Sequence, residues 1–485
     1  MDTLRLKMIY EVFMFILDAK NKTPLYRQLY QQLRVKILNG EIPPKARLDS
    51  SRNLSTELKI SRNTVELAYQ QLLAEGYIVG KSRSGYYVET INNENVPFLP
   101  EIPETEIFPE STDEKIKYNF TYGNLPADTF PFSKWQNLTN VCFRKHKNQL
   151  LKYSSFMGEL GLRKEIAKYL RIYRDVKCSV DQILITSGIT EGLALVCQLF
   201  HSDTTAVAME EPGFRRAYLT FRNQGFRVDP ISLNHHGINV KSLNTSTAKV
   251  VYVTPSHQFP TGSIMSITRR LRLIEWAYKR NAYIIEDDYS SHLRYDVKPI
   301  SSLQGLAPEK VIYIGSFSKM LLPSLRVAYM VLPKNLVQKM QDQSSFIPCS
   351  VPFIVQKPLE LFMQEGYFES HLRKMVNHFK KKHSALVCAL QENFGDEIFI
   401  FGQSAGVHLL VQINCNASAQ KLVEQAAKAG IVISASDKLW TQVEPPLYPQ
   451  ILLGFSAIAL DDIAPAVRLL RKIWFEDRLR KSPSL

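Results

Sequence analysis

A long segment near the start of the chain cannot belong to a compact domain. No helical or strand period runs through residues 92–117, and acidic residues outnumber basic ones there. The segment is interrupted by four prolines: Pro97, Pro100, Pro103 and Pro109. Such segments behave as extended tethers, and structureless loops of this length are unusual inside one domain. We therefore expect three parts: a small domain over residues 13–90, a linker over 91–117 and a large domain over 118–478.

The composition limits the class of protein. Hydrophobic residues make up 45% of the chain and charged residues 22%, which excludes disorder over the whole length and a collagen-like chain. The six cysteines form no Cys-x-x-Cys pair, which argues against structural zinc and a disulfide framework and favours the reducing cytoplasm. No apolar run reaches the length of a membrane span. We expect a cytoplasmic protein with no metal and no membrane partner.

The small domain shows the pattern of a winged helix-turn-helix. We expect residues 1–12 to be a weakly ordered extension and Phe13–Leu17 to be a short strand. Ser61 is a good N-cap for the last of three helical patterns, which cover residues 24–39, 51–58 and 62–75. Two strand-like runs then flank a basic hairpin tip, Lys81-Ser82-Arg83-Ser84, which would form the wing.

These features suit a domain that binds duplex DNA. The first turn of a recognition helix enters the major groove, and Arg62, Asn63 and Thr64 are long or polar enough to reach base edges and phosphates. Basic side chains elsewhere suit phosphate contacts: Arg47, Arg52, Lys81 and Arg83. The net charge of +14 permits an anionic partner. On charge alone, a helical bundle with a solvated basic face would be the better interpretation, but the order of capped helices, tight turn and basic hairpin favours DNA.

Residues 24–88 resemble the GntR-type winged helix-turn-helix over nearly the whole small domain. The similarity is carried by PLYRQLYQQLRVKILNGEIPPKARLDSSRNLSTELKISRNTVELAYQQLLAEGYIVGKSRSGYYV. One departure is Asp49, which stands where that family usually has proline before two serines. We expect Asp49 to loosen the turn or weaken a nearby phosphate contact.

The large domain alternates short apolar runs with helical segments, which predicts an α/β fold with a buried sheet. Three polar motifs follow such runs: Ser187-Gly188-Ile189-Thr190, Glu286-Asp287-Asp288-Tyr289 and Ser316-Phe317-Ser318-Lys319. The first could seat a phosphate at a helix start. The second offers a carboxylate for a protonated ring nitrogen, and the third a lysine for a Schiff base with Arg326 nearby for a phosphate. Taken singly, each could be an ordinary capped helix, an acidic loop or a pair of surface cations.

Together the three motifs meet the requirements of pyridoxal 5'-phosphate, and their order resembles fold-type I aminotransferases over about residues 120–475. The similar segments are SGITEGLAL, EEPGF, TPSHQFPTG, EDDY and GSFSKMLLPSLR. The resemblance implies that Lys319 forms the Schiff base, Asp287 binds the pyridine nitrogen, Tyr289 the phenolic oxygen, and Phe214 stacks on the ring. It assigns the phosphate to Gly188, Ile189, Thr190, Ser316, Ser318 and Arg326.

The two halves joined by a linker resemble the MocR/GabR family, in which a GntR-type domain is fused to an aminotransferase-like domain that senses a ligand. Three positions depart from catalytic aminotransferases. Phe259 stands in place of the asparagine of Asn-Pro-Thr-Gly. His257 or Gln258 would have to replace the hydrogen bond of that asparagine to the phenolic oxygen. Leu452 stands in place of the arginine for the substrate carboxylate. His292 stands where an acid is more usual.

These residues leave two main functions open. The first is a pyridoxal phosphate-dependent transcription regulator with little or no turnover, which Leu452 favours. The second is an active aminotransferase with an appended DNA-binding domain. In a third and weaker interpretation the large domain only dimerises. The expected partners are operator DNA, a second copy of the chain, and an effector. That effector is an amino compound or pyridoxal phosphate itself in control of vitamin B6 synthesis, and Arg215 and Arg216 could bind an anionic one.

Overall fold

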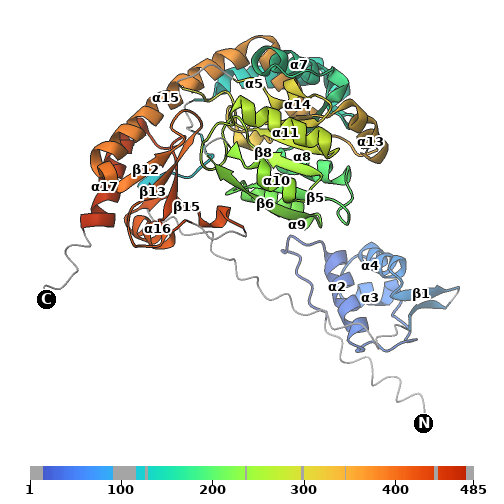
Figure 1. Cartoon of the computed structure of the whole chain (residues 1–485). Coiled ribbons are helices and arrows are strands. Elements are labelled where there is room, and N and C mark those ends of the chain that lie inside the picture. Colours follow the sequence, from blue (N-terminus) through green and yellow to red (C-terminus); the bar gives the residue numbers. More distant parts are fainter. Residues whose placement is uncertain are drawn as a thin grey trace. The chain divides into compact units, whose positions relative to one another are not determined.

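The computed structural model describes residues 15–82, 84–90, 116–125, 129–234, 237–295, 300–344, 346–441 and 446–476. The chain forms two compact units, Met1–Thr112 and Asp113–Leu485, here called the N-terminal and the C-terminal unit (Figure 1). The expected extension, Arg83 and nearly all of the expected linker lie outside the described residues. Among the described helices, none is both long and apolar enough to cross a membrane.

In its described residues the N-terminal unit has three helices and a hairpin. Its elements are α2 (Leu25–Leu38), α3 (Ser51–Glu57), α4 (Arg62–Ala74), β1 (Ile78–Lys81) and β2 (Gly85–Val88). Ser50 and Ser61 cap α3 and α4, because each hydroxyl accepts a hydrogen bond from a first-turn N–H at 3.1 Å. The helices enclose a core of their own that includes Leu29, Val65 and Leu72. The helical order therefore follows the expected winged helix-turn-helix.

The predicted strand at Phe13–Leu17 is wrong for its described part. Residues 15–18 are irregular. The backbone of Ile16 is satisfied by the side chain of Gln32, which accepts from its N–H at 3.0 Å and donates to its carbonyl at 2.6 Å. Phe15 and Leu17 pack against the core of the unit. An apolar segment thus covers the helices without joining a sheet, because a glutamine side chain meets its backbone needs.

The C-terminal unit is built on a sheet of eight strands in the order β4-β11-β10-β9-β8-β5-β6-β7. The strands β10, β9, β8, β5 and β6 run parallel, whereas β11 is antiparallel to β10 and β4, and β7 to β6. Their bounds are β4 (Ile183–Thr186), β5 (Ala206–Glu211), β6 (Arg227–Asn234), β7 (Gly237–Ile238), β8 (Val250–Val253), β9 (Tyr283–Asp288), β10 (Val311–Ser316) and β11 (Ala328–Val331).

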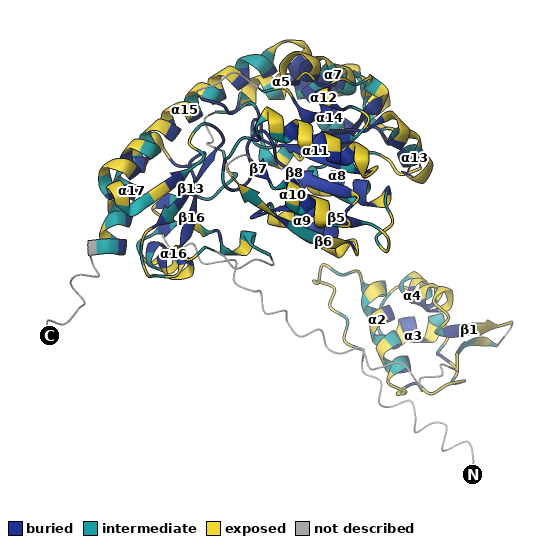
Figure 2. Cartoon of the chain, in the orientation of Figure 1, coloured by how far each residue is buried: buried dark blue, intermediate teal, exposed yellow. Residues whose placement is uncertain are grey.

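Helices cover both faces of this sheet, as parallel sheets require. Alternate strand residues divide between two cores. Leu184, Met209 and Ile312 pack with one set of helices: α8 (Ile189–Gln198), α9 (Arg215–Asn223) and α13 (Lys334–Ser344). The opposite face is covered by α7 (Leu160–Arg174), α10 (Val240–Thr245), α11 (Ile267–Lys279), α12 (Leu303–Leu306) and α14 (Phe353–Gln364). The strands are accordingly mostly dark blue in Figure 2, and the outer faces of the helices carry exposed residues.

A smaller antiparallel sheet lies in the C-terminal third, with strand order β12-β13-β16-β15. Its strands are β12 (Ile398–Phe401), β13 (His408–Ile413), β15 (Ser434–Ala435) and β16 (Gln450–Gly454). It is flanked by the helices α16 (Ala419–Lys428) and α17 (Ile463–Arg471), and α15 (Tyr367–Phe394) leads to it. The remaining helices are α5 (Phe132–Lys145) and α6 (Lys147–Leu150).

A short early strand is tied to this C-terminal part. β3 (Tyr118–Asn119) pairs in parallel with β14 (Ile431–Val432). Beyond it, the carbonyl of Phe120 accepts a hydrogen bond from the N–H of Gly454 in β16 at 2.8 Å. The residues that directly follow, including Tyr122, are thereby placed beside strands encoded more than three hundred residues later.

Candidate functional sites

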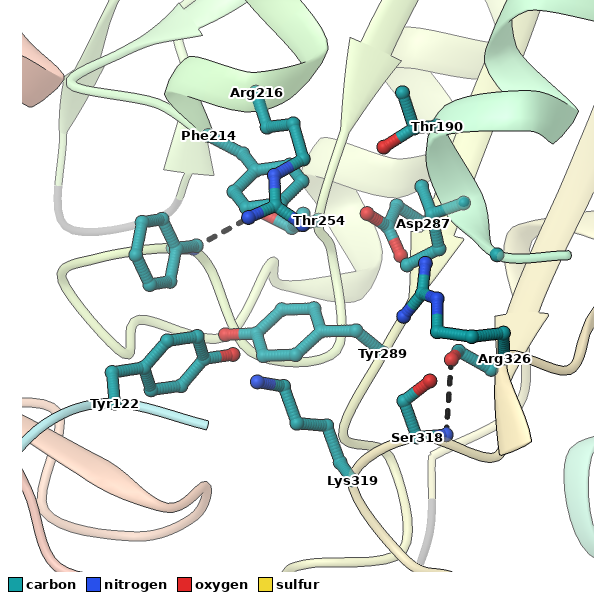
Figure 3. Close-up of a pocket in the computed structure, with 14 residues that line it drawn as sticks. Tyr122, Thr190, Phe214, Arg216, Thr254, Asp287, Tyr289, Ser318, Lys319 and Arg326 are labelled. Carbon is teal, nitrogen blue, oxygen red and sulfur yellow. Dashed lines mark hydrogen bonds between the residues drawn. The ribbon is translucent and has the colours of Figure 1, made fainter. Parts of the chain in front are cut away.

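A cavity of about 190 Å³ opens at the carboxyl ends of the parallel strands (Figure 3). This is where open α/β sheets bind their ligands. The structure brings together there all ten residues predicted to hold the cofactor: Gly188, Ile189, Thr190, Phe214, Asp287, Tyr289, Ser316, Ser318, Lys319 and Arg326. Four further residues line the cavity: Tyr122, Arg216, Thr254 and Phe259.

One end of the cavity is shaped for a phosphate. Gly188 has a φ of 132°, and a Cβ at this position would lie 2.3 Å from Nη2 of Arg326. The guanidinium therefore lies directly over the glycine backbone that leads into α8, where N–H groups favour an anion. The N–H of Ser318 donates to Oγ of Ser316 at 3.1 Å, and the buried Oγ of Ser318 has no partner among the described residues. The Arg326 cation, the start of α8 and the two serine hydroxyls thus lie together, in an arrangement that favours a phosphate.

Asp287 lies on β9 beside β10, in register with Ile314. It is 2% exposed. Tyr252 donates a hydrogen bond to its Oδ2, and its Oδ1 has no partner in the described part of the chain. Burial, reinforced by the nearby charges of Asp288 and Glu210, raises the pKa of Asp287 to about 7, whereas Lys319 lowers it. A carboxylate oxygen is therefore available for a cationic N–H donor in the cavity.

Lys319 projects from the loop after β10 and faces Tyr122, with its Nζ 3.8 Å from the ring centroid (Figure 3). A Cβ on Gly123 would lie 2.6 Å from this nitrogen, so the glycine makes room for the lysine. Burial, together with the charges of Arg216 and Arg326, lowers the pKa of Lys319 to about 8 against the opposing effect of Asp287. A substantial fraction of this amine is neutral near pH 8, as a nucleophilic lysine requires.

Two of the further lining residues were not predicted. Thr254 directly follows β8 and had no role assigned, although the rule that ligands bind at strand ends would have identified it. Tyr122 lies far from every recognised motif and reaches the cavity only through the pairing of the early strand with C-terminal strands. Its contribution needs the tertiary structure.

Neither residue named as a substitute for the missing asparagine lines the cavity. Nδ1 of His257 lies 2.9 Å from the hydroxyl of Tyr289. The amide of Gln258 instead donates to the carbonyl of Pro212 at 2.9 Å. Burial lowers the pKa of His257 well below its usual value, so the ring is neutral. His257 thus positions Tyr289, and a hydrogen bond from either residue to the phenolic oxygen of a cofactor stays a prediction.

Leu452 closes the region where catalytic aminotransferases have an arginine. It lies on β16 opposite Leu410, and both pack in an apolar cluster with Phe259 and Tyr289. Leu452 is 6% exposed and does not line the cavity. The described residues of this cluster offer no cation to a carboxylate, whereas Arg216, which is exposed, lines the cavity.

The N-terminal unit presents its predicted DNA contacts on the surface. Arg52, Arg62 and Asn63 are exposed. Nε of Arg62 forms an ion pair with Glu66 of the same helix at 2.8 Å and lies 3.4 Å from the hydroxyl of Ser51 on α3. Thr64 is half-buried, and its hydroxyl lies 2.8 Å from that of Ser61. Its side chain therefore supports the helix cap.

The predicted wing is the hairpin of β1 and β2, to which a neighbouring backbone segment is bonded. The backbone of residues 45–48 bonds to β2, with the N–H of Leu48 donating to Tyr86 at 2.9 Å. Arg47 and Lys81 are exposed on this structure, and Nζ of Lys81 lies 4.6 Å from the ring centroid of Tyr87. The turn at Asp49 is held by its carbonyl, which accepts from the hydroxyl of Tyr69 at 2.9 Å. Arg83 lies outside the described residues.

Comparisons with known protein families match both units. Residues 25–88 match the model of the bacterial regulatory proteins of the gntR family. Residues 115–439 match the model of aminotransferase class I and II. A DNA-binding helix-turn-helix followed by an aminotransferase-like domain defines a class of transcription regulators.

Several relatives match this chain over both units. The chain is 35% identical over 452 residues to the uncharacterized HTH-type transcriptional regulator YdeL of Bacillus subtilis, covering 93% of this chain and 97% of that protein. It is 29% identical over 477 residues to the probable rhizopine catabolism regulatory protein MocR of Rhizobium meliloti, covering 94% and 95%. It is 28% identical over 429 residues to the pyridoxine biosynthesis regulator PdxR of Corynebacterium glutamicum, covering 87% and 90%. The chain belongs to the MocR family of GntR-type transcription regulators.

The fold of the C-terminal unit is that of fold-type I aminotransferases. The crystal structure of LysN, an alpha-aminoadipate aminotransferase from Thermus thermophilus complexed with N-(5'-phosphopyridoxyl)-L-leucine, has a TM-score of 0.67 and 25% identity. The match covers 75% of this chain and 93% of that one. The predicted fold class is therefore confirmed for both units.

Proposed function

We propose that this transcription regulator binds pyridoxal 5'-phosphate in the cavity and uses the occupied cavity to control its attachment to DNA. The observation that carries the proposal is the meeting of Lys319, Asp287 and Arg326 in one cavity, from three separate segments of the chain. An amine, a buried carboxylate and a phosphate-binding cation are the groups that this cofactor needs.

The residues present fit the cofactor. The free Oδ1 of Asp287 would accept the N–H of the protonated pyridine ring. The backbone at Gly188, where a Cβ would collide with Arg326, would hold the phosphate together with the Ser316 and Ser318 hydroxyls. Phe214 would cover one face of the ring. When bound, the cofactor supplies an electrophilic carbonyl and an electron-withdrawing ring, and the neutral fraction of Lys319 is the group that attaches it.

Regulation rather than turnover is the better-supported activity. The relatives reported above that span both units are named as regulators. Leu452 and its apolar cluster remove the cation that would hold a substrate carboxylate opposite the ring. We infer that transaminase activity is vestigial or absent. The alternative, an active aminotransferase with a DNA-binding domain, is favoured by the lowered pKa of Lys319. Single-turnover absorbance measurements with amino acids separate the two alternatives. Conversion of the bound cofactor within seconds would support the enzyme.

The effector is either the cofactor itself or an anionic amino compound. A cavity of about 190 Å³ accommodates little beyond one cofactor-sized molecule, and the relative PdxR is named for pyridoxine biosynthesis. These observations favour pyridoxal phosphate as the effector, in control of vitamin B6 synthesis. Arg216, exposed at the cavity wall, would instead serve an anionic ligand. Arg215 is less suited, because its guanidinium donates to the carbonyl of Lys438 at 3.0 Å.

A homodimer is supported by an exposed apolar face next to the cavity. Leu151, Tyr153 and Phe346 are 86%, 89% and 79% exposed. Their segments meet at the end of β4, because Ile185 donates to the carbonyl of Met157 at 3.1 Å and accepts from Cys349 at 3.5 Å. Large exposed apolar residues in one region mark association surfaces. Light scattering on the cofactor-loaded protein tests this: a monomer at micromolar concentration would contradict it.

The central experiment measures DNA binding with and without the cofactor. An operator is first selected from random duplexes, and fluorescence anisotropy then gives the Kd of the full-length protein with no ligand, pyridoxal phosphate, other B6 vitamers or amino acids. We expect pyridoxal phosphate to change the Kd or the preferred spacing of half-sites, since a ligand acts only by favouring one arrangement. The Arg216→Ala variant is the control for anionic amino compounds. An unchanged Kd for every ligand would refute the sensing role.

A further inference from the structure

A second cavity, of about 420 Å³, lies in the C-terminal unit and shares no residue with the cofactor cavity. This volume is within the range of small-molecule sites, about 300–1,000 Å³. We propose that it binds a free amino acid with an apolar or aromatic side chain, which gives the regulator a second input beside its cofactor.

One wall of the cavity is a single face of α15. Glu369, Leu372, Arg373 and Val376 line it at positions i, i+3, i+4 and i+7 of the helix. The inaccessible Oε2 of Glu369 forms no hydrogen bond within the described residues. Arg373 is exposed. The wall thus places an anion and a cation one helical turn apart, with two apolar side chains between and beyond them.

The floor is formed by the loop that follows β9. Ser291 is 2% exposed, lines the cavity and has a hydroxyl without a partner in the described part of the chain. Its neighbour His292 contacts Tyr169, and burial lowers the pKa of His292 to about 4, so the ring is neutral. A buried hydroxyl without a partner costs free energy, which a ligand hydrogen bond would recover.

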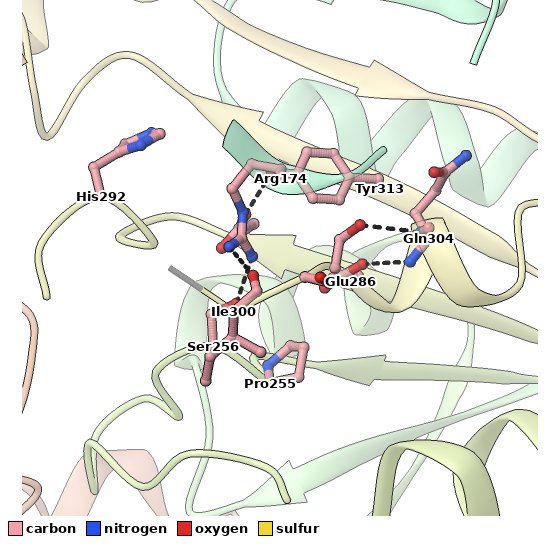
Figure 4. Close-up of polar contacts among 12 residues, drawn as sticks. Arg174, Pro255, Ser256, Glu286, His292, Ile300, Gln304 and Tyr313 are labelled. Atoms are coloured by element: carbon pink, nitrogen blue, oxygen red, sulfur yellow. Dashed lines mark hydrogen bonds and ion pairs between the residues drawn. The ribbon is translucent and has the colours of Figure 1, made fainter. Parts of the chain in front are cut away.

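The other cation of the cavity is already engaged. Arg174, at the end of α7, donates from Nε to Asp288 at 2.7 Å and from Nη2 to the hydroxyl of Ser256 at 2.8 Å (Figure 4). It also donates to the carbonyl of Ile300. Three of the five N–H donors of Arg174 are thus engaged within the protein and its charge is paired with Asp288, whereas Arg373 has no ion pair among the described residues and is the cation that remains to pair with an anion.

These features specify the ligand class. An amino acid carries an ammonium and a carboxylate on adjacent atoms, which match Glu369 and Arg373 at their helical spacing. Its side chain would then lie against Leu372, Val376 and the ring of Tyr173, which also line the cavity. A simple anion would meet the repulsion of Glu369, and a simple amine that of Arg373.

The cavity is connected to the cofactor site through the chain itself. Asp287 and Asp288 are the last two residues of β9, and Tyr289 and Ser290 lead from them to Ser291 and His292. Asp288 is the carboxylate paired with Arg174. A ligand that fixes Ser291 therefore restrains the loop whose other end bears the ring-binding groups.

Isothermal titration of the cofactor-loaded full-length protein with individual L-amino acids tests the proposal. We expect at least one apolar or aromatic amino acid to bind, and its amide and N-acetyl derivatives to bind about tenfold more weakly or worse, because each lacks one charge. Arg373→Ala and Glu369→Gln should weaken binding to a similar extent. Lys374→Ala, which removes the adjacent exposed cation outside the cavity, should leave the Kd within about twofold.

Arg216→Ala separates this cavity from the cofactor cavity. If the amino acid loses affinity in Arg216→Ala and keeps it in Arg373→Ala, it binds beside the cofactor and the second site is refuted. The same conclusion follows if no L-amino acid binds the wild-type protein, or if both derivatives bind as well as the parent. A melting temperature of Arg373→Ala equal to that of Lys374→Ala shows that lost binding is not lost folding.

Discussion

The two units expose their functional side chains in opposite ways. The Arg62 side chain on α4 is 65% exposed, whereas Asp287 in the cavity is 2% exposed. Charges at the surface are screened by salt. Groups in the cavity have displaced pKa values, about 7 for Asp287 and about 8 for Lys319. DNA binding should therefore respond to ionic strength, and cofactor binding to pH near neutrality.

The largest expected effect is on covalent attachment. Lys319→Ala should abolish the borohydride-stable adduct with pyridoxal phosphate, because it removes the amine that faces the cavity. Mass spectrometry of the reduced protein measures the adduct, and Lys168→Ala, an exposed lysine on α7, serves as the control. An adduct on another lysine in the wild-type protein would refute the assignment.

Gly188→Ala should weaken cofactor affinity by about a hundredfold, or roughly 2.7 kcal/mol. The new Cβ would displace Arg326 from the phosphate seat, in addition to the backbone strain at a φ of 132°. Gly366→Ala is the matched control, because its φ is also positive, at 73°, but no atom lies within 4 Å of the added carbon. Fluorescence titration with pyridoxal phosphate measures both, and equal losses would contradict the steric argument.

On the exposed side, Arg62→Ala should weaken binding to the selected operator by about 1–3 kcal/mol, if it contacts a guanine edge. The same change releases Glu66 from its ion pair. The double variant Arg62→Ala, Glu66→Gln therefore serves as the control, because it also removes the acidic charge that Arg62→Ala alone leaves unpaired. Competition between operator and random duplex should show a loss of specificity, and an equal loss on both sequences would place Arg62 on the phosphates.

The pH response of the cofactor-free protein follows from Asp287. Burial raises the pKa of Asp287 from 3.8 to about 7, so the folded state keeps the proton that the unfolded state has lost. Its contribution to stability is therefore lost as pH rises through this interval. Asp287→Asn should stabilise the apo-protein by about 1 kcal/mol at pH 8 and have no effect near pH 4. Thermal melts at the two pH values check this, and a pH-independent difference would contradict it.

The smallest effect is expected at the wing. Lys81→Ala should weaken all DNA sequences alike, and reduce the slope of log K against log salt by about 0.9 if one phosphate contact is lost. Anisotropy titrations over a range of salt concentrations measure the slope. A change confined to the operator would show that Lys81 contacts bases.

Sequence patterns located the cavity because its groups stand at strand ends. The apolar run Val311–Ile314 predicted β10, and the polar residues behind it, including Lys319, lie where parallel strands end together. Tyr122 could not be predicted, since its place depends on pairing with a strand near residue 431. The contact of His257 with Tyr289 could not be predicted either. It depends on a turn in which the side chain of Gln258 donates to backbone carbonyls instead. Residues 15–17 show that an apolar run need not form a strand or be buried, because Phe15 and Leu17 are half-buried and Ile16 is exposed.

The bond between Gly454 and Phe120 has a consequence for synthesis of the protein. The N-terminal unit has its own core and is complete once its residues have left the ribosome. The wall of the cavity at Tyr122 cannot form until β16, the last of the described strands, has been translated. A chain cut short before β16 would therefore carry a finished DNA-binding domain and an unfinished cofactor cavity, so the capacity to respond is acquired only by a nearly full-length molecule.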